Sequence, residues 1–158
     1  MKSILGISAF YHDSAAVLIK NGEIVSAAQE ERFSRKKHDS RFPENAIKYC
    51  IKSNNLDLQD IKNIVYYEKP LLTFERLLET YVAFAPKGFK SFSLSMPIWL
   101  REKLFQKKFL FDKLKLHDKN FKNIDKIKFS EHHYSHAASA FFPSPFENAI
   151  VLTLDGVG

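Results

Sequence analysis

The sequence predicts a mixed α/β fold in which helices cover a sheet. Three short apolar segments fall within the first 28 residues, and Asn21-Gly22, a typical hairpin turn, separates the last two. Further apolar segments then alternate with segments that have the 3.6-residue period of a helix. Of the 158 residues, 45% are hydrophobic and 27% are charged, as in chains that bury a core. We therefore expect one mixed sheet with flanking helices.

The amino-terminal part is expected to form an antiparallel meander of three strands. Its segments are residues 4–8, 15–20 and 23–28, each of which is short and largely apolar. Asn21 and Gly22 tolerate positive φ angles, so they can connect the second and third strands in a tight turn.

A helix and then a strand are expected next. The helix is predicted to have Pro43 at its first position and to end at Asn54-Asn55. Its apolar side has helical spacing and consists of Ala46, Ile47, Cys50 and Ile51. Cys50 is therefore expected to be an inert part of the core. Residues 61–67 are typical of a strand, which could lie parallel to an earlier one because a helix precedes it.

The middle of the chain, about residues 70–125, is expected to be a helical and basic insertion. Apolar residues recur at helical spacing from Leu71 to Tyr81 and again from Ile98 to Phe109, with a break at residues 86–88. Residues 87–128 contain eleven lysines and one arginine against four acidic residues, so the net charge of +6 originates there. A solvated amphipathic helix explains this pattern, and a surface for nucleic acid or an anionic membrane is the alternative.

The last part of the chain is expected to return to the sheet. Residues 126–129 are typical of a strand, and residues 131–140 are typical of a helix that Pro143 and Pro145 end. Residues 149–154 form a near-continuous apolar run, which predicts a strand buried on both faces.

The strongest chemical signal is the histidine-rich segment 132–136. On the predicted helix, His132 and His136 lie one turn apart with about 5–6 Å between their β-carbons, so their imidazoles can share a metal ion. A zinc protease motif would have glutamate directly after the first histidine, but His133 stands there, which excludes that class. A polar helix start without a ligand explains the spacing equally well.

Asp155 is a candidate third ligand because it follows the apolar run. A carboxylate at the end of a buried strand needs a partner or a metal ion, and two imidazoles with one carboxylate leave open positions for substrate. Gly156 and Gly158 let the backbone approach a bound ligand and expose its N–H groups. The alternative is a turn aspartate that accepts hydrogen bonds from the local backbone.

Two more polar clusters follow predicted strands. Residues 11–14 connect the first two strands, and His12 there could act as a general acid or base or bind an anion. The alternative is a turn histidine that is hydrogen-bonded within the protein. Residues 30–39 follow the third strand, and the basic residues Arg35, Lys36 and Lys37 could bind a phosphate. A solvated charged loop is the alternative for this cluster.

The composition also excludes some classes of protein. A single cysteine cannot form an intrachain disulfide, and nothing in the sequence indicates secretion. No apolar run reaches 18 residues, so no membrane-spanning helix is expected. The apolar run at the amino terminus is too short for the hydrophobic region of a signal peptide. We therefore expect a cytoplasmic protein without a membrane partner.

Two groups of segments, one toward each end of the chain, form a recognisable set. The first group comprises residues 4–16, 29–38 and 42–43, and the second comprises residues 131–141, 144–146 and 152–158. In sequence and in order, these segments resemble the O-carbamoyltransferase family of antibiotic and nodulation-factor biosynthesis. Residues 69–128 carry no signature of that family.

The resemblance implies both a fold and a reaction. Family members resemble the tRNA threonylcarbamoyl-transfer ATPases and share an ATPase fold of the actin/Hsp70/sugar-kinase type. Residues 1–158 would form its first, ribonuclease-H-like lobe, and a domain with a YrdC-like fold follows in the family. The implied reaction uses carbamoyl phosphate and ATP to make a carbamoyl-adenylate, whose carbamoyl group passes to an acceptor hydroxyl.

The resemblance also implies three groups of functional residues. They are a divalent-metal site for iron, zinc or manganese at His132, His136 and Asp155, a transfer site at His12 and Lys37, and nucleotide contacts at Gly156 and Gly158. The metal ion and cationic side chains would stabilise the oxygen on the attacked carbamoyl carbon.

The chain departs from the family in its length, because family proteins are several times longer. We therefore expect that this polypeptide alone neither binds ATP tightly nor turns over. Besides a small-molecule hydroxyl acceptor, its expected partner is a second lobe, which could belong to another chain.

Three other functions compete with this interpretation. One is a lobe of a tRNA threonylcarbamoyl-type transferase. Another is a nucleic-acid- or anionic-surface-binding module that uses basic residues 87–128, although nucleic acid is the less favoured partner. The last is a degenerate remnant without activity. Residues 11–13 and 132–136 argue against a sugar kinase.

Overall fold

The computed structural model describes residues 2–154, apart from the side chains of residues 71–74, 76, 77, 95 and 98–104. The strands are β1 (Ser3–Ser8), β2 (Ala15–Lys20), β3 (Glu23–Gln29), β4 (Asn63–Tyr66) and β5 (Ile127–Phe129). The α-helices are α1 (Glu31–Ser34), α2 (Glu44–Lys52), α3 (Pro70–Phe84), α4 (Phe89–Leu104), α5 (Gln106–His117) and α6 (His132–Phe141). Two 3₁₀ turns, Leu58–Asp60 and Ile124–Lys126, precede β4 and β5.

The strands form one mixed sheet in the order β3-β2-β1-β4-β5. The pairs β1–β2 and β2–β3 are antiparallel, so the predicted meander is confirmed. Asn21 and Gly22 have φ angles of 53° and 96°, as a tight hairpin turn requires. The pairs β1–β4 and β4–β5 are parallel, which confirms that the strand after α2 runs alongside an earlier one.

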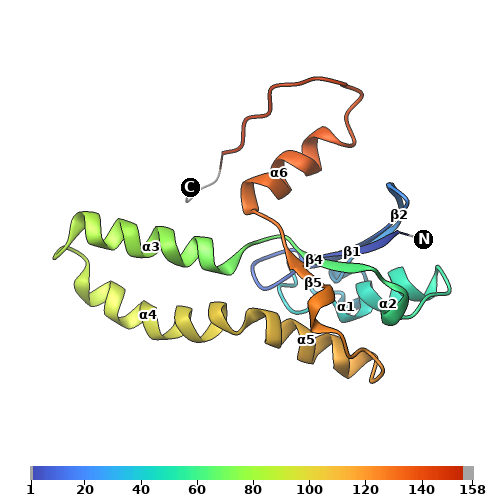
Figure 1. Ribbon diagram of the computed structural model, residues 1–158, viewed down its shortest axis with the longest axis horizontal. Helices are drawn as coiled ribbons and strands as arrows, with labels where there is room; N and C mark the ends of the chain where they lie inside the picture. The colour runs from blue at the N-terminus through green and yellow to red at the C-terminus, as the bar shows by residue number, and fades with distance from the viewer. Residues whose placement is uncertain (1, 155–158) are drawn as a thin grey trace.

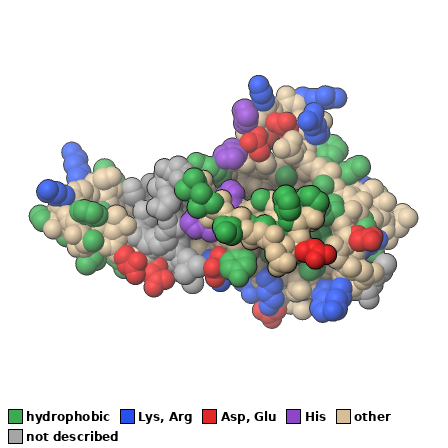
Figure 2. Space-filling view, turned by 90° about the horizontal axis from the view of Figure 1, so that it is seen from above, with side chains coloured by type: hydrophobic (Ala, Val, Ile, Leu, Met, Phe, Trp, Pro, Cys, Tyr) green, Lys and Arg blue, Asp and Glu red, His purple; other side chains and the backbone are tan. Residues whose placement is uncertain are grey.

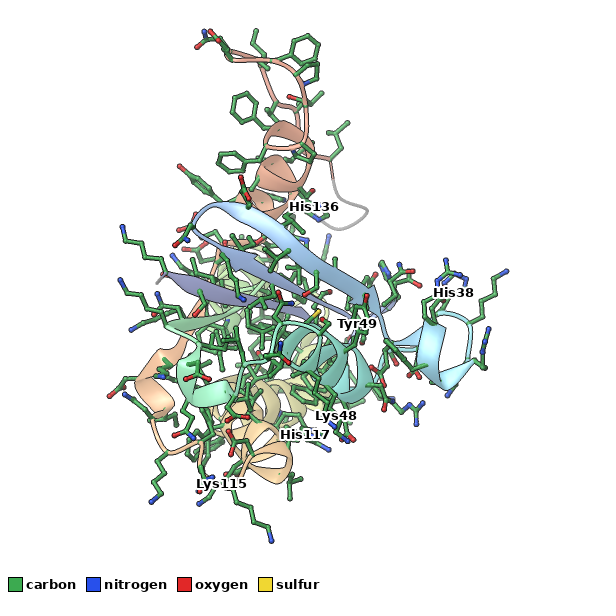
Figure 3. The ribbon with its side chains drawn as sticks, turned by 90° about the vertical axis from the view of Figure 1, so that its right-hand side faces the viewer. His38, Lys48, Tyr49, Lys115, His117 and His136 are labelled. Atoms are coloured by element: carbon green, nitrogen blue, oxygen red, sulfur yellow. The ribbon has the colours of Figure 1, made fainter. Side chains whose placement is uncertain are left out.

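The core lies on one face of this sheet. Alternate residues of β1, β2 and β4 are buried, including Leu5, Leu18 and Ile64. They pack with the apolar sides of α2 and α5 into a single cluster. Figure 1 shows α2 and α5 on this side of the strands and α6 on the other. In Figure 3, Lys48, Lys115 and His117 lie on the side of α2 and α5, opposite His136.

The predicted helical side of α2 is confirmed, and Cys50 is fully buried in the core. Burial raises the pKa of its thiol, as expected of an inert cysteine. The predicted helix boundaries were wrong by a few residues. Pro43 is the residue that precedes α2, and α2 ends at Lys52, before Asn54.

The middle of the chain is helical, as predicted. Helices α3 and α4 form a hairpin that extends away from the sheet, and α5 returns beneath it (Figure 1). Tyr81 and Phe92 stack with their ring centroids 3.9 Å apart, which connects α3 to α4. Within the described residues, no helix combines the length and apolar character needed to cross a lipid bilayer.

The prediction of a buried strand at residues 149–154 was wrong. These residues have no regular secondary structure, and the side chains of Ile150, Leu152 and Leu154 are 102%, 78% and 83% exposed. A strand forms only where a neighbouring backbone pairs with its N–H and C=O groups. Among the described strands, none pairs with this segment, so its apolar composition alone does not make it a strand.

A buried carboxylate connects the sheet to α2. Glu30 is 3% exposed and follows β3 directly. Its carboxylate oxygens accept hydrogen bonds from the Asn45 and Ala46 backbone N–H groups at 3.0 and 2.9 Å and from Asn45 Nδ2 at 2.7 Å. Glu30 therefore satisfies the free N–H groups at the start of α2, where the helix dipole also favours a negative charge.

We predict that Glu30→Gln lowers the free energy of unfolding by about 1–3 kcal/mol, because the amide keeps only one accepting oxygen, places a donating NH₂ group against the donors of Asn45 and Ala46, and removes the negative charge at the start of α2. Urea unfolding followed by circular dichroism measures this loss. Glu23→Gln, at the exposed start of β3, removes the same charge and serves as the control. Equal stability of the two variants would contradict the role given to Glu30.

Candidate functional site

The direction of the strands brings four connecting segments to one edge of the sheet. Strands β4 and β5 are parallel to β1, and β3 also runs in that direction because both β1 and β3 are antiparallel to β2. The segments that follow these strands, residues 9–14, 30–41, 67–69 and 130–136, therefore leave the sheet at the same edge. Ligands of α/β sheets bind outside the carboxyl ends of the strands, and these segments contain most of the candidate residues.

His132 and His136 meet at the start of α6. Their Nε2 atoms are 3.2 Å apart, and their rings are perpendicular with centroids 4.6 Å apart. Two zinc–imidazole bonds of about 2.0–2.1 Å at a near-tetrahedral angle place their nitrogens about 3.2–3.4 Å apart. The pair therefore has the chemistry and the spacing of two ligands to one divalent ion.

The third predicted ligand, Asp155, and the predicted nucleotide contacts Gly156 and Gly158 lie outside the described residues. Where side chains are described, no group of three or more histidine, cysteine or carboxylate side chains is placed to hold a metal ion. Within this part of the chain, His132 and His136 thus supply two donors of a metal site.

Contacts with the residues after β4 fix the position of α6. Ser135 Oγ donates to the Tyr67 carbonyl oxygen at 2.9 Å, and Lys69 Nζ donates to Glu131 Oε1 at 2.7 Å. The Tyr67 ring lies 5.7 Å from the His132 ring. These contacts fix the histidine pair relative to the end of β4.

His12 lies in a cluster with Asp13 and His38. Asp13 accepts a hydrogen bond from the Nδ1 atom of each histidine, at 2.9 Å in both cases. The His38 and then the His12 hydrogen bond lower the pKa of the Asp13 carboxyl. Sequence reasoning missed His38 because 25 residues separate it from Asp13. The histidines are exposed, so a ligand in solvent can reach them.

Lys37 comes directly before His38 and is exposed. The hydrogen bond between His38 and Asp13 therefore brings the segment of Lys37 to the loop of His12. The two residues predicted for the transfer site belong to segments that meet, although they are far apart in the sequence. Figure 3 shows His38 on the segment that projects beyond the sheet.

An aromatic ring lies beside each of the two histidine clusters. The Tyr11 ring lies 4.6 Å from the His12 ring, and Tyr67 stands beside His132. Burial is the main cause that raises the pKa of the Tyr67 phenol, with smaller contributions from Glu68 and Tyr11. Figure 2 shows histidine side chains gathered on the face seen from above.

The basic segment uses some of its lysines in contacts within the protein. Lys126 Nζ donates to the Gln59 carbonyl oxygen at 2.6 Å, and Lys107 lies 3.6 Å from Asp125. Lys113 and Lys115 lie over phenylalanine rings of α5. These contacts fit the interpretation of a solvated helix whose lysines also pack along its surface.

A family comparison supports the carbamoyltransferase resemblance. The family model described as carbamoyltransferase N-terminus matches residues 3–158. The chain belongs to this carbamoyltransferase family. The match includes both histidine clusters and the basic segment between them.

Individual relatives of this carbamoyltransferase domain come from distant organisms. The chain is 58% identical to the uncharacterized protein sll1178 of Synechocystis, in a match that covers all of the chain and 26% of the relative. It is 35% identical to the nodulation protein NolNO of Sinorhizobium fredii, with 96% of the chain and 20% of the relative covered. It is 29% identical to the uncharacterized protein MJ1058 of Methanocaldococcus jannaschii, with 31% of that protein covered. The chain thus spans a fifth to a third of the length of these relatives.

An ion pair between a buried carboxylate and an exposed guanidinium holds the segment after His38 in the carbamoyltransferase domain. Asp39 is buried, and the Arg41 guanidinium donates to its two oxygens at 2.9 and 2.6 Å. The Arg41 hydrogen bond, followed by one from Ser34, holds the pKa of Asp39 well below its usual range. A carboxyl with a lowered pKa in the folded state stabilises the fold above the unfolded pKa of about 3.9. This stabilisation is lost as the pH falls below that value.

We predict that Asp39→Asn lowers stability at pH 7 and removes part of the decline in stability that the wild type shows below about pH 4. Urea unfolding at pH 7 and pH 3 measures both effects. Asp112→Asn, which changes an exposed carboxyl of α5, is the control. The same decline in the Asp39 variant and the wild type would show that the ion pair does not contribute.

Proposed function

We propose that this chain is the amino-terminal lobe of an enzyme that transfers a carbamoyl group to an acceptor hydroxyl. The observation that carries the proposal is the 3.2 Å approach of His132 Nε2 and His136 Nε2, in a chain of the carbamoyltransferase family. The sheet order β3-β2-β1-β4-β5, with an antiparallel meander and two further parallel strands, supports a ribonuclease-H-like lobe of an actin-type ATPase.

His132 and His136, together with Asp155, would hold a divalent ion such as iron, zinc or manganese. When bound, such an ion supplies a Lewis acid for the oxygen of the attacked carbamoyl group. The helix fixes the two imidazoles, and Ser135 and Glu131 fix the start of the helix against the residues that follow β4. The protein therefore orients the two imidazoles before any ligand arrives, which favours binding.

His12 and Lys37 would act on the acceptor and on the developing charge. The acceptor oxygen forms a bond to the carbamoyl carbon, and the bond from that carbon to the adenylate oxygen breaks, so AMP leaves. His12 would take the proton of the acceptor hydroxyl, and the Lys37 ammonium would stabilise the carbamoyl oxygen as it becomes negative. The exposure of both side chains suits a soluble acceptor.

The whole reaction requires more than this lobe. Water would release phosphate from carbamoyl phosphate, and attack of the resulting carbamate on the α-phosphorus of ATP would give the carbamoyl-adenylate and release pyrophosphate. Backbone N–H groups at Gly156 and Gly158 would contact the nucleotide. The relatives are three to five times longer than this chain, in agreement with a second lobe and a further domain for that step. The proposed partners are therefore a second lobe and a small molecule with a hydroxyl group.

We predict that His132→Ala/His136→Ala weakens binding of one divalent ion by at least about 100-fold, because loss of outer-shell contacts alone costs 10–100-fold at metal sites. Titration with Co²⁺ and Zn²⁺, monitored by calorimetry and by the Co²⁺ absorption bands, measures the affinity.

The matched control is His133→Ala on the same turn of α6, which should retain the affinity of the wild type. Thermal unfolding of each variant without metal establishes that the fold is intact. The same stoichiometry and affinity in the double variant and the wild type would remove the observation that carries the proposed function.

A further inference from the structure

The cluster around Asp13 contains an imidazole to which the proposed mechanism assigns no role. One carboxylate accepts from two imidazoles, His12 through Oδ2 and His38 through Oδ1. The two histidines come from different segments, one after β1 and one after β3. Sequence proximity explains the His12 contact but not the His38 contact, so the second contact depends on the tertiary structure.

Backbone hydrogen bonds hold the two segments in register around this contact. The Ser14 N–H donates to the Asp39 carbonyl oxygen, and the Phe10 N–H donates to the Ser40 carbonyl oxygen, both at 2.8 Å. The first bond joins the direct chain neighbours of Asp13 and His38, and the second joins residues three and two positions away from them. The contact between the two side chains is therefore fixed by the backbone on either side of it.

His38 and Asp13 both have the left-handed backbone conformation, with φ angles of 54° and 48°. This conformation is uncommon outside glycine and costs energy, so the surroundings must stabilise it. The His38 N–H donates to Glu31 Oε2 at 3.1 Å, while its ring donates to Asp13. His38 is thus held at its backbone by α1 and at its ring by the loop after β1.

The donor and acceptor roles in this cluster follow from the chemistry of the carboxylate. An ionised carboxylate only accepts hydrogen bonds, so each imidazole must carry its proton on Nδ1. The Nε2 atom of each neutral ring then has a free lone pair. Among the described residues, none donates to Nε2 of His12 or His38, and both rings are largely exposed.

We propose that Asp13 is a positioning residue that holds His12 and His38 together with Nδ1 protonated, so that His38 presents a second Nε2 acceptor to the hydroxyl substrate beside His12. The part of this inference that concerns the substrate rests on the proposed function. A substrate with two or more hydroxyl groups, such as a sugar or polyol, has the donors that two such acceptors bind. If one Nε2 takes the reacting proton, Asp13 also stabilises the resulting imidazolium.

The test is the tautomer of each imidazole, read from long-range ¹H–¹⁵N correlation spectra of the ¹⁵N-labelled chain near pH 7.5. The chain has six histidines, and His12→Gln and His38→Gln assign the two signals. We expect both histidines in the wild type to have the Nδ1–H pattern. An Nε2–H pattern at either of them in the wild type overturns the proposal without any Asp13 variant.

The decisive variant is Asp13→Asn, because asparagine also tolerates the left-handed conformation. The two imidazoles contact different oxygens of Asp13, so in asparagine the NH₂ group replaces one of these acceptors and faces one Nδ1 atom, which must then accept. One imidazole should therefore keep the Nδ1–H pattern. We expect the other to change to Nε2–H. Glu23→Gln removes a charge at the far edge of the sheet and should change neither signal.

Two unchanged Nδ1–H patterns in Asp13→Asn would show that another group sets the tautomers, which overturns the proposal. The samples for these spectra contain no metal ion, nucleotide or carbamoyl donor. A failure of the proposed metal site therefore leaves them unaltered, and the two hypotheses can fail separately.

A titration of the wild-type chain with glycerol or glucose tests the substrate class. We expect selective shifts of the His12 and His38 signals. Absence of these shifts at high concentrations of glycerol and glucose would contradict a polyhydroxyl substrate.

Discussion

The common direction of β1, β3, β4 and β5 is the constraint on which the candidate site depends. It follows from two antiparallel pairs and two parallel pairs, and it places the ends of four strands at one edge of the sheet. Each candidate side chain that the structure describes follows one of these strands. Reversal of any one of these strands would move its candidate residues to the other edge, where Asn21 and Gly22 turn the chain.

Buried polar contacts then give the connecting segments defined positions. Tyr66 donates from its hydroxyl to the Ala9 carbonyl oxygen at 2.7 Å, which ties the loop after β1 to β4. Glu30 ties the end of β3 to α2, and the Asp39–Arg41 pair orders the residues between them. An unsatisfied buried polar group costs about 1–3 kcal/mol, so these contacts restrict the loops to few arrangements. The exposed histidines and Lys37 are therefore presented by a rigid support.

Local patterns in the sequence account for most of the elements, because turn chemistry and side-chain periodicity act over a few residues. The meander around Asn21-Gly22 and the apolar side of α2 are examples. The pairing of His132 with His136 was also predictable, since one helical turn separates them. The His38–Asp13 contact was not, because it depends on how two distant loops pack. Residues 149–154 show the converse, since an apolar run forms a strand only beside a partner.

Paramagnetic broadening measures whether both histidine clusters lie at one edge of the sheet. Mn²⁺ is added in substoichiometric amounts to the ¹⁵N-labelled chain, and amide signal loss is compared with that of His132→Ala/His136→Ala. We expect preferential loss at residues 9–14, 67–69 and 131–137, with the turn at Asn21-Gly22 least affected. Broadening at that turn equal to the broadening at residues 9–14, or no difference between the wild type and the double variant, would contradict the account.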